Sequence, residues 1–517
     1  MRDTLYNIMV EAGDRIAVLD QDKSYRYQDV LSDAALLHEK LSLAAEGKPS
    51  GTHILMSAQR SYTSVVMYVF SVVYGYTLVP VTAEIDNRSL ERLINELPVA
   101  FFFTDVSTSR LLTVATHSDC PTLVAQCGGS LHQGVFTQSV SAFSFTKAKV
   151  AATSSHASPS QDNPDLYLIF TSGSTGNPKG VSVETRNLLN YLEATRDEFG
   201  ICADDVLSHI SPLSFDFSIH EIFIALFNQA AIAVLRENDK FNFSGYLLRH
   251  AVSVWASVPS TLAYLNKTRQ LNPNQYPALR LAFVGGEPVH PSLLYTLSLA
   301  APNCTVYSYY GPTECTVAMM AYRYDPTQEY AQHMPLGRPF GGHRVFIQTE
   351  KDGAFHATGT GEAYIAGPQV LKAYWKNPEQ TALRFSYHPE HGYMFRTGDM
   401  IRIEDDGNHV FIARQDDDIK IGGYRFNTAA CRTFVEEVSE AEDVVVTPFS
   451  HSTEGTFDRL LVVTVNAKIT EAALARIFRD QYDNYVQPHF INVSELPRNR
   501  NGKLDKKALM EKVACHV

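Results

Sequence analysis

The chain has 517 residues, of which 45% are hydrophobic and 19% are charged, and this is the composition of an ordinary globular protein with an ample core. Its 44 basic and 56 acidic residues give a formal net charge of −12, which argues against nucleic acid as a partner. The 7 cysteines include no CxxC pair, which argues against a disulfide scaffold or a zinc site and favours reduced thiols, so we expect a cytoplasmic protein.

The N-terminal part raises two questions of targeting. Segment 1–18 carries acidic residues at positions 3, 11 and 14, so we do not expect a signal peptide. Segment 64–81, SVVMYVFSVVYGYTLVPV, is apolar enough to raise the question of a membrane span. Because it contains Gly75, Pro80 and several tyrosines, we interpret it as a buried helix, a turn and a buried strand, without membrane insertion.

Apolar, β-rich segments alternate with helical patterns along the next part of the chain. We expect buried strands at 52–58, 76–81, 100–105, 166–171, 230–235, 252–258 and 279–286. We expect helices at 89–97 and 185–199. This alternation indicates parallel α/β layers.

The pattern changes in the last third of the chain. After about residue 340 the sequence predicts short strands, with turns at 350–353 and 404–407. A last part, from about 417 to 517, mixes strands at 443–449 and 459–467 with a helix at 470–482. We therefore predict an α/β fold: a large N-terminal domain of layered α/β subdomains plus a β-rich subdomain, followed by a small α+β C-terminal domain.

The stretch 169–180, IFTSGSTGNPKG, places a polar loop directly after the apolar segment LYLIF. Its glycines let the backbone approach a ligand closely, and successive N–H groups can form a concave nest for phosphate oxygens. Serine and threonine hydroxyls add donors, and Lys179 adds a positive charge. It is not a Walker A loop, which needs Gly-Lys followed by Ser or Thr. We predict an anion-binding loop, with a Gly/Ser-rich surface turn as the alternative.

Further stretches combine turn residues with reactive side chains. They are SPLSFDFSIHEIF at 211–223, VGGEP at 284–288, YYGPTECT at 309–316, FRTGD at 395–399 and PRNRNGKLDKKAL at 497–509. Each also has a plain structural interpretation: Asp216 as a helix N-cap, GPTE as a capping turn, FRTGD as a hairpin turn, and the basic stretch as a solvated face. Their occurrence together, in this order, favours a functional interpretation.

The elements TSGSTGNPKG, GPTE, RTGD and NGK resemble those of the adenylate-forming superfamily, which comprises acyl-CoA synthetases, luciferases and peptide-synthetase adenylation domains. The resemblance spans nearly the whole chain, from YGYTLVPV to NGKLDKKAL. It implies a ligase with two half-reactions: a carboxylate attacks the α-phosphorus of ATP to give an acyl-adenylate and pyrophosphate, and a thiol then takes the acyl group. Such chemistry depends on positioning and charge neutralisation.

The resemblance implies ATP and Mg²⁺ as cofactors and a set of nucleotide-binding residues. These are Thr171, Ser172, Gly173, Ser174, Thr175, Gly176, Lys179, Gly286, Glu287, Tyr310, Gly311, Thr313, Asp399, Arg414 and Lys503. Tyr310 would pack on adenine, and Asp399 would accept the ribose hydroxyls. Glu314 and Thr171 would lie near Mg²⁺, which prefers oxygen ligands, and we count both with Lys503 as catalytic.

The resemblance also implies a division of the chain into a core, 1–413, a hinge, 414–416, and a mobile C-terminal domain, 417–517. Lys503 on the mobile domain would bridge the carboxylate and the α-phosphate. Rotation about Asp416 would then remove Lys503 and admit the thiol.

Three positions depart from the family pattern. They are Thr185, where histidine is frequent, Ala413, where glycine is usual, and Asn427, where an acidic residue is usual. These departures put local contacts in doubt but not the reaction.

Asp216, in FDFS, decides the expected substrate class. In amino-acid-activating members this aspartate pairs with the α-ammonium group, and a lone buried carboxylate would be costly without such a partner. The other pocket positions implied by the resemblance are Phe217, His220, Ser257, Phe283, Gly285, Tyr309, Val317 and Ala318, with Lys503. Four large rings leave little volume, which favours glycine first and alanine next. Threonine or serine stays open, because His220, Ser257 and Tyr309 can hydrogen-bond a hydroxyl.

The thiol acceptor is expected on a separate molecule, because no carrier-type serine motif follows Lys503. We expect a monomeric, free-standing enzyme that loads a phosphopantetheinylated carrier protein, similar to ligases that supply D-alanine or glycine for teichoic acid or lipid A; this last step is an analogy. The alternatives are threonine or serine activation for nonribosomal peptide synthesis, an acyl-CoA synthetase, and a non-catalytic nucleotide-binding scaffold.

Overall fold

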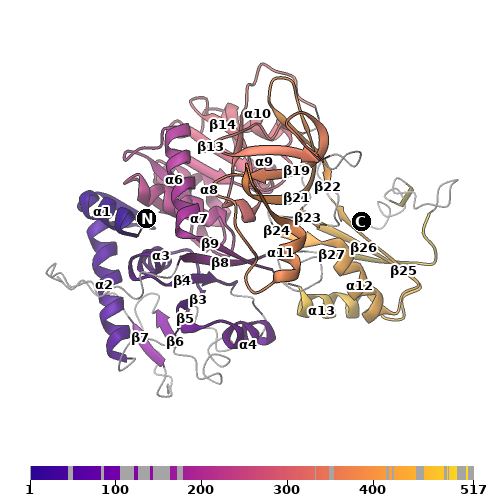
Figure 1. The fold of residues 1–517 in the computed structure, drawn as a ribbon, viewed down its shortest axis with the longest axis horizontal. Coiled ribbons are helices and arrows are strands. Elements are labelled where there is room, and N and C mark those ends of the chain that lie inside the picture. Colours follow the sequence, from indigo (N-terminus) through magenta and orange to yellow (C-terminus); the bar gives the residue numbers. More distant parts are fainter. Residues whose placement is uncertain are drawn as a thin grey trace. The chain divides into compact units, whose positions relative to one another are not determined.

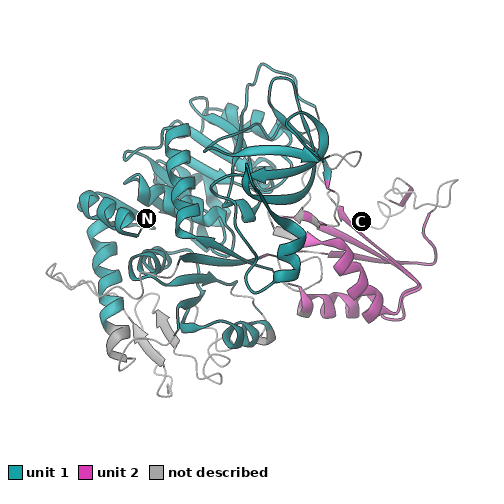
Figure 2. Cartoon of the chain, viewed as in Figure 1, with its two compact units in different colours: residues 1–170, 179–413 teal, residues 171–178, 414–517 magenta. Residues whose placement is uncertain are grey.

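The computed structural model describes residues 2–44, 51–82, 85, 87–104, 122–125, 140–143, 164–171, 179–331, 333–348, 354–414, 418–421, 424–449, 459–482, 486, 488–497 and 508–509. The chain forms two compact units (Figure 2). Unit 1 comprises residues 1–170 and 179–413, and unit 2 comprises residues 171–178 and 414–517. Figure 1 labels the helices and strands along the chain.

A seven-stranded sheet forms one layer of unit 1, and its described pairings are all parallel. Its strands, in spatial order, are β7 (Val140–Phe143), β6 (Thr122–Ala125), β5 (Val99–Thr104), β3 (His53–Ser57), β4 (Thr77–Pro80), β8 (Asp165–Thr171) and β9 (Lys179–Glu184). Strands β3 and β4 are buried at every residue, as in a parallel sheet covered on both faces. The strands expected in this region are confirmed.

A nine-stranded sheet forms a second layer of unit 1. In spatial order its strands are β16 (Arg338–Pro339), β15 (Met320–Arg323), β14 (Thr305–Tyr310), β13 (Leu281–Gly285), β12 (Val254–Ser257), β10 (Val206–His209), β11 (Ala231–Val234), β1 (Ile16–Asp20) and β2 (Lys23–Arg26). The six strands from β14 to β1 are parallel, and antiparallel pairing occurs only towards the two edges. Parallel strands all end at one edge, so the segments after β12, β13 and β14 lie near each other.

The helices of unit 1 cover and separate these sheets. They are α1 (Arg2–Ala12), α2 (Tyr27–Ala44), α3 (Tyr62–Tyr74), α4 (Asn87–Glu96), α6 (Thr185–Phe199), α7 (Phe217–Phe227), α8 (Phe243–Arg249), α9 (Pro259–Lys267), α10 (Pro291–Ala300), α11 (Pro378–Arg384) and the 3₁₀ helices η1 (Glu237–Asn242) and η2 (Thr313–Cys315). Every residue of α7 is buried, and one core contains side chains of α3, α7 and both sheets. The buried polar residues of this helix, Ser218, His220 and Glu221, therefore need partners inside the protein.

Helix α3 also settles the interpretation of segment 64–81. The helix ends at Tyr74, Gly75 caps it with a positive φ of 79°, and β4 follows. Among the described residues, no helix combines the length and apolar character that crossing a membrane requires.

An antiparallel sheet completes unit 1 and confirms the change of pattern expected after residue 340. Its strands are β18 (Phe355–His356), β17 (Arg344–Gln348), β19 (Gly359–Ala366), β21 (Gly392–Ile403) and β20 (Phe385–His388), with β22 (His409–Arg414) paired to β21. The turn expected at 404–407 joins β21 to β22, whereas the turn expected at 350–353 lies outside the described residues.

Unit 2 has its own apolar core and mixes strands with helices. Its described elements are β23 (Asp418–Ile421), β24 (Tyr424–Asn427), α12 (Thr428–Ser439), β25 (Asp443–Phe449), β26 (Arg459–Val465), α13 (Glu471–Gln481) and β27 (Pro488–Val493). Strand β26 pairs antiparallel with β25 and parallel with β27. The α+β character expected of this part of the chain is confirmed.

Candidate active site

The start of α7 carries Asp216, which stands at the position before the helix and is 5% exposed. Its side chain makes no capping hydrogen bond, so a simple N-cap role does not explain it. The carboxylate influences two buried tyrosines. Burial, followed by the charge of Asp216, raises the pKa of Tyr167 on β8, and burial above all, with a smaller contribution from Asp216, raises the pKa of Tyr191 on α6. The Asp216 carboxylate therefore faces the interior of unit 1.

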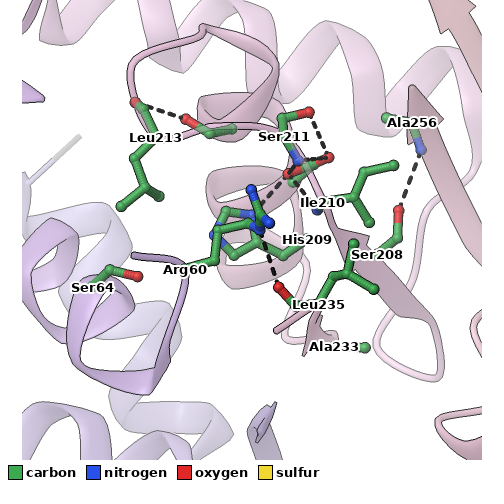
Figure 3. Close-up of polar contacts among 12 residues, drawn as sticks. Arg60, Ser64, Ser208, His209, Ile210, Ser211, Leu213, Ala233, Leu235 and Ala256 are labelled. Carbon is green, nitrogen blue, oxygen red and sulfur yellow. Dashed lines mark hydrogen bonds and ion pairs between the residues drawn. The ribbon is translucent and has the colours of Figure 1, made fainter. Parts of the chain in front are cut away.

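A buried polar network holds the segment that leads to Asp216 (Figure 3). Glu221, on α7, accepts a hydrogen bond from His209 Nδ1 at 2.7 Å and from the Ser211 hydroxyl at 2.8 Å, and the Glu221 and His209 side chains are fully buried. Arg60, from the loop after β3, donates to the Leu235 carbonyl at 3.1 Å. The contacts of Glu221 join α7 to the end of β10 and to Ser211, and Arg60 joins the loop after β3 to the segment after β11. Sequence reasoning did not single out this network.

Four aromatic side chains predicted to line the pocket lie together in unit 1. The ring centroids of Phe217 and His220 are 6.3 Å apart, and those of His220 and Phe283 are 5.3 Å apart. The Tyr309 ring is 5.0 Å from Phe283 and 6.0 Å from His220. All four side chains are buried. Helix α7 and strands β13 and β14 thus contribute to one aromatic cluster.

Tyr191 on α6 belongs to the same cluster, although sequence reasoning missed it. Its hydroxyl lies 2.6 Å from His220 Nδ1 and 3.2 Å from the Tyr309 hydroxyl, and all three side chains are buried. Burial lowers the pKa of His220 to about 3, so the imidazole is neutral at ordinary pH. Tyr191 occupies an apolar position of an amphipathic helix, where a core tyrosine is the ordinary expectation, so the sequence carries no signal for this role.

Three predicted glycines are constrained by the backbone: Gly285 and Gly311 by close packing, and Gly286 by its positive φ. A Cβ at Gly285 would lie 2.0 Å from the Tyr309 carbonyl oxygen, and Gly286 has a φ of +87°. A Cβ at Gly311 would lie 2.3 Å from Ala318 Cα. Val317 adopts a φ of 70°, which is rare for a β-branched residue, and segments held in this way cluster at functional sites.

Ser257 lies in a different position from the rings. It pairs with Val284, whose side chain lies in a second core, whereas Phe283 and Tyr309 lie in the first. The Ser257 hydroxyl is buried without a hydrogen-bond partner among the described residues. Its role in the pocket stays a prediction.

Glu314 forms a second cluster, on η2. It is 1% exposed, and it accepts a hydrogen bond from the Tyr374 hydroxyl at 2.6 Å. Lys179, the first residue of β9 and also buried, places Nζ 5.6 Å from the centroid of the Tyr374 ring. The Trp375 amide donates to the Gly180 carbonyl at 2.8 Å, which joins the two segments. Tyr374 was not predicted; it brings a predicted carboxylate and a predicted lysine to one place.

Tyr310 and Asp399 form a third predicted pair. The Tyr310 hydroxyl donates to Asp399 Oδ2, and the Asp399 amide donates to the Thr397 hydroxyl at 2.9 Å. Asp399 is 5% exposed. Tyr310, which precedes GPTE, and Asp399 of FRTGD are 89 residues apart in sequence and therefore meet at one place of unit 1.

The remaining predicted residues divide into described and undescribed ones. Glu287 follows Gly286, Thr313 begins η2, Thr171 ends β8 and Arg414 ends β22. The Thr171 hydroxyl is buried without a hydrogen-bond partner among the described residues. The others lie outside the described residues: Ser172, Gly173, Ser174, Thr175, Gly176, Asp416 and Lys503.

Comparison with protein families identifies one that covers most of the chain. The family described as AMP-binding enzyme matches residues 8–375. The D-alanine--D-alanyl carrier protein ligase of Lacticaseibacillus casei (strain BL23) is 30% identical over 372 residues, which cover 69% of this chain and 72% of that protein. Malpinin synthetase of Mortierella alpina is 30% identical over 366 residues, or 66% of this chain. The match spans only 5% of that synthetase.

The fold has a well-matched solved counterpart. The crystal structure of the Vibrio cholerae adenylation domain AlmE in complex with glycyl-adenosine-5'-phosphate superposes with a TM-score of 0.86. The match covers 99% of this chain and 97% of that chain, at 23% sequence identity. The α/β fold class expected from the sequence is therefore confirmed.

Proposed function

This chain belongs to the AMP-binding enzyme family, and from that premise we propose that it is an AMP-forming amino acid–[carrier protein] ligase. It adenylates a small amino acid, glycine first and alanine next. It then transfers the aminoacyl group to the phosphopantetheine thiol of a separate carrier protein. One observation carries the amino-acid assignment: the buried carboxylate of Asp216, beside a cluster of four aromatic rings.

The substrate class follows from charge and volume. Burial of a carboxylate is costly, and a cationic ligand offsets that cost, which an α-ammonium group can do. The rings of Phe217, His220, Phe283 and Tyr309 restrict the side chain that can accompany that ammonium group. Exclusion of large side chains is steric and strong, whereas a single methylene is worth only about 1–3 kcal/mol.

The clusters around Glu314 and Asp399 suit the two ends of a nucleotide. Mg²⁺ prefers oxygen ligands, so the Glu314 carboxylate would bind this ion, and Thr171 would be the second residue near it. Lys179 would balance phosphate charge with the loop 171–176. Tyr310 with Gly311 and Thr313 would border the adenine, next to Gly286 and Glu287, and Asp399 would accept the ribose hydroxyls, with Arg414 nearby. Bound magnesium would neutralise charge on the phosphates.

We assign the adenylation step to Lys503. The substrate carboxylate oxygen forms a bond to the α-phosphorus while the bond from that phosphorus to the bridging oxygen breaks, and pyrophosphate leaves. A lysine is suited to the charge that develops between the two reactants. The hinge role of Asp416 and the mobility of residues 417–517 belong to the same proposal. Lys503→Ala is expected to abolish adenylation and leave ATP binding largely intact, and unchanged adenylation would refute this assignment.

The acceptor is proposed from the relatives. The Lacticaseibacillus protein acts with a carrier protein, as its name says, and matches this chain over most of both lengths. A role in modifying lipid A or teichoic acid in the cell envelope is proposed by analogy alone, and it requires that a carrier protein be identified. The enzyme is proposed to act as a monomer in the cytoplasm.

Amino-acid-dependent ATP–pyrophosphate exchange tests the proposal. The panel contains glycine, both alanines, serine, threonine, proline, larger amino acids, and acetate as a control without an amine. A strong signal with glycine or alanine is expected. A signal only with acetate or a large acid would refute the substrate assignment, and the formation of a coenzyme A thioester would favour the acyl-CoA synthetase alternative. Exchange with none of the acids would favour a nucleotide-binding scaffold.

Serine or threonine is the second candidate substrate, and one observation favours it. His220 Nε2 is buried and has no hydrogen-bond partner among the described residues. A hydroxyl on the substrate side chain would supply that partner, whereas glycine and alanine would not.

A further inference from the structure

The hydroxyl of Tyr191 stands between two other polar groups of the pocket. It is 2.6 Å from His220 Nδ1 and 3.2 Å from the Tyr309 hydroxyl. The three residues come from α6, α7 and β14, so the contact joins three elements that are distant in sequence. No nearby residue in the sequence marks Tyr191 as part of the pocket.

The protonation states of these groups fix the direction of the hydrogen bonds. Burial lowers the pKa of His220 to about 3, and burial also raises the pKa values of Tyr191 and Tyr309 above their ordinary value. The imidazole is therefore neutral, with one donor and one acceptor nitrogen, and both phenols keep their protons. A distance of 2.6 Å fits an O–H donor and is shorter than the usual range for an N–H donor. Tyr191 therefore donates to Nδ1, and the proton of His220 is on Nε2.

The other side of the His220 ring then offers one N–H donor. Nε2 is buried and has no partner among the described residues, and the ring packs between Phe217, Phe283 and Tyr309. A buried donor without an acceptor is unfavourable, so a ligand atom that accepts from Nε2–H is bound preferentially.

We propose that Tyr191 is a specificity-determining positioning residue, which fixes His220 as the Nε2–H tautomer and so presents one oriented donor to the side chain of the bound amino acid. The inference rests on the proposed adenylation of a small amino acid. It bears on the second candidate substrate, serine or threonine, by naming the side-chain feature that this donor would recognise: an oxygen acceptor on a small side chain.

The selectivity test compares two isosteric substrates, serine and 2-aminobutyrate, which differ by a hydroxyl in place of a methyl group. In the wild-type enzyme, kcat/KM for pyrophosphate exchange is expected to be about tenfold higher with serine, as befits one neutral hydrogen bond. Tyr191→Phe keeps the ring and removes the hydroxyl, so the preference is expected to fall to about twofold or less. Glycine has no acceptor on its side chain, so its kcat/KM is expected to fall less than that of serine in this variant.

Tyr246→Phe is the matched control. The Tyr246 hydroxyl is also buried and makes two hydrogen bonds, donating to the Ala233 carbonyl at 2.7 Å and accepting from the His209 amide at 3.2 Å. Tyr246 belongs to the second core of unit 1, whereas Tyr191 belongs to the first. This variant is expected to keep the serine preference of the wild type. A merely structural role of Tyr191 would instead lower exchange with glycine and serine alike.

A second measurement does not depend on activity. Nitrogen-15 NMR of histidine-labelled protein distinguishes the two neutral tautomers, and comparison with His220→Gln identifies the signals of His220. The wild type is expected to show the Nε2–H tautomer alone, and Tyr191→Phe is expected to show a mixture.

The outcomes separate the two proposals. Absence of exchange with every amino acid would refute the proposed function, while the NMR result would still decide the role of Tyr191. An Nδ1–H tautomer in the wild type, equal use of serine and 2-aminobutyrate, or a serine preference that survives in Tyr191→Phe would each overturn this inference.

Discussion

The network around His209 and the aromatic cluster around His220 each contain a buried histidine, and Nδ1 donates a hydrogen bond in the first ring and accepts one in the second. In both, Nδ1 has a close partner and Nε2 has none among the described residues. At His209 the partner is Glu221, which accepts through both oxygens, so Nδ1 must donate. At His220 the partner is the hydroxyl of Tyr191, which donates to Nδ1.

In a neutral imidazole, the hydrogen bond made by one ring nitrogen decides whether the other nitrogen is a donor or an acceptor. A carboxylate partner accepts the hydrogen bond from His209 Nδ1 and ties β10 to α7 inside the core. A phenol partner leaves His220 with a donor, next to the residues proposed to hold the substrate. The first region therefore serves stability, and the second is suited to recognition.

The largest effect is expected on stability, from a change at Glu221, the carboxylate partner of His209. Glu221→Gln replaces one of the two acceptor oxygens, which face His209 and Ser211, by a donor. Breaking a buried pair of this kind costs about 3 kcal/mol or more in the free energy of unfolding. Urea unfolding followed by tryptophan fluorescence measures the loss, because both tryptophans, Trp255 and Trp375, lie in unit 1. Ser211→Ala, which removes one donor, is the control and should cost about 1 kcal/mol. Equal stability of Glu221→Gln and the wild type would contradict the structural role.

Asp216→Asn tests whether the carboxylate of Asp216 binds the ammonium group of the substrate. The variant keeps the shape of the side chain and loses the charge, so kcat/KM for the amino acid in pyrophosphate exchange is expected to fall about 100-fold, which corresponds to a lost charge pair. The dissociation constant of ATP should stay the same, because the change removes only the partner of the ammonium group. Unchanged exchange with glycine and alanine would show that Asp216 does not bind the ammonium group.

The pH dependence of stability sharpens the comparison at His220. Burial lowers its pKa from 6.5 to about 3, so the unfolded chain binds a proton below pH 6.5 that the folded protein does not bind. Stability is therefore lost as pH falls from 6.5 towards 3, by about 2 kcal/mol at pH 5. His220→Gln has no such proton to bind, and urea unfolding between pH 5 and 7 should show the smaller dependence. Parallel curves for the two proteins would mean that His220 has the same pKa in the folded protein as in the unfolded chain.

The smallest effect is expected from removing the Tyr309 hydroxyl, which contacts Tyr191 and not His220 directly. Tyr309→Phe removes a donor that is 3.2 Å from Tyr191, and it leaves the shorter contact to His220 in place. The serine preference should change less than threefold, and stability should fall by less than about 1 kcal/mol. If the serine preference changed as much as in Tyr191→Phe, the hydroxyls of Tyr191 and Tyr309 would act together in orienting His220.

Much of the fold could be predicted because periodicity reports local burial. The helix expected at 185–199 is observed as α6 with those bounds, and the strand expected at 443–449 is observed as β25. The parallel layers followed from apolar strands that alternate with helical segments. Segment 64–81 was correctly divided into α3 and β4, and Gly75 is the residue that ends the helix, whereas Pro80 is the last residue of β4.

The partners within the candidate site could not be predicted in the same way. Tyr191 lies 29 residues before His220, and Tyr374 lies 60 residues after Glu314, so both contacts depend on how distant elements pack. In the sequence both tyrosines occupy positions typical of ordinary core residues. Motifs indicated the groups that carry charge, such as Glu314, Asp399 and Lys179, and gave no indication of the neutral hydroxyls that orient them. The roles of Lys503 and of loop 172–176 stay predictions.

The close approach at Gly285 limits how this pocket can be re-engineered. Any side chain at this position would meet the Tyr309 carbonyl oxygen at 2.0 Å, a main-chain atom that cannot be moved aside by a rotamer change. A library for altered substrates that randomised Gly285 would therefore consist mostly of misfolded variants. Diversity placed at Phe217, Phe283 and His220 would change the volume of the pocket and leave its backbone intact, so new substrates should be sought there.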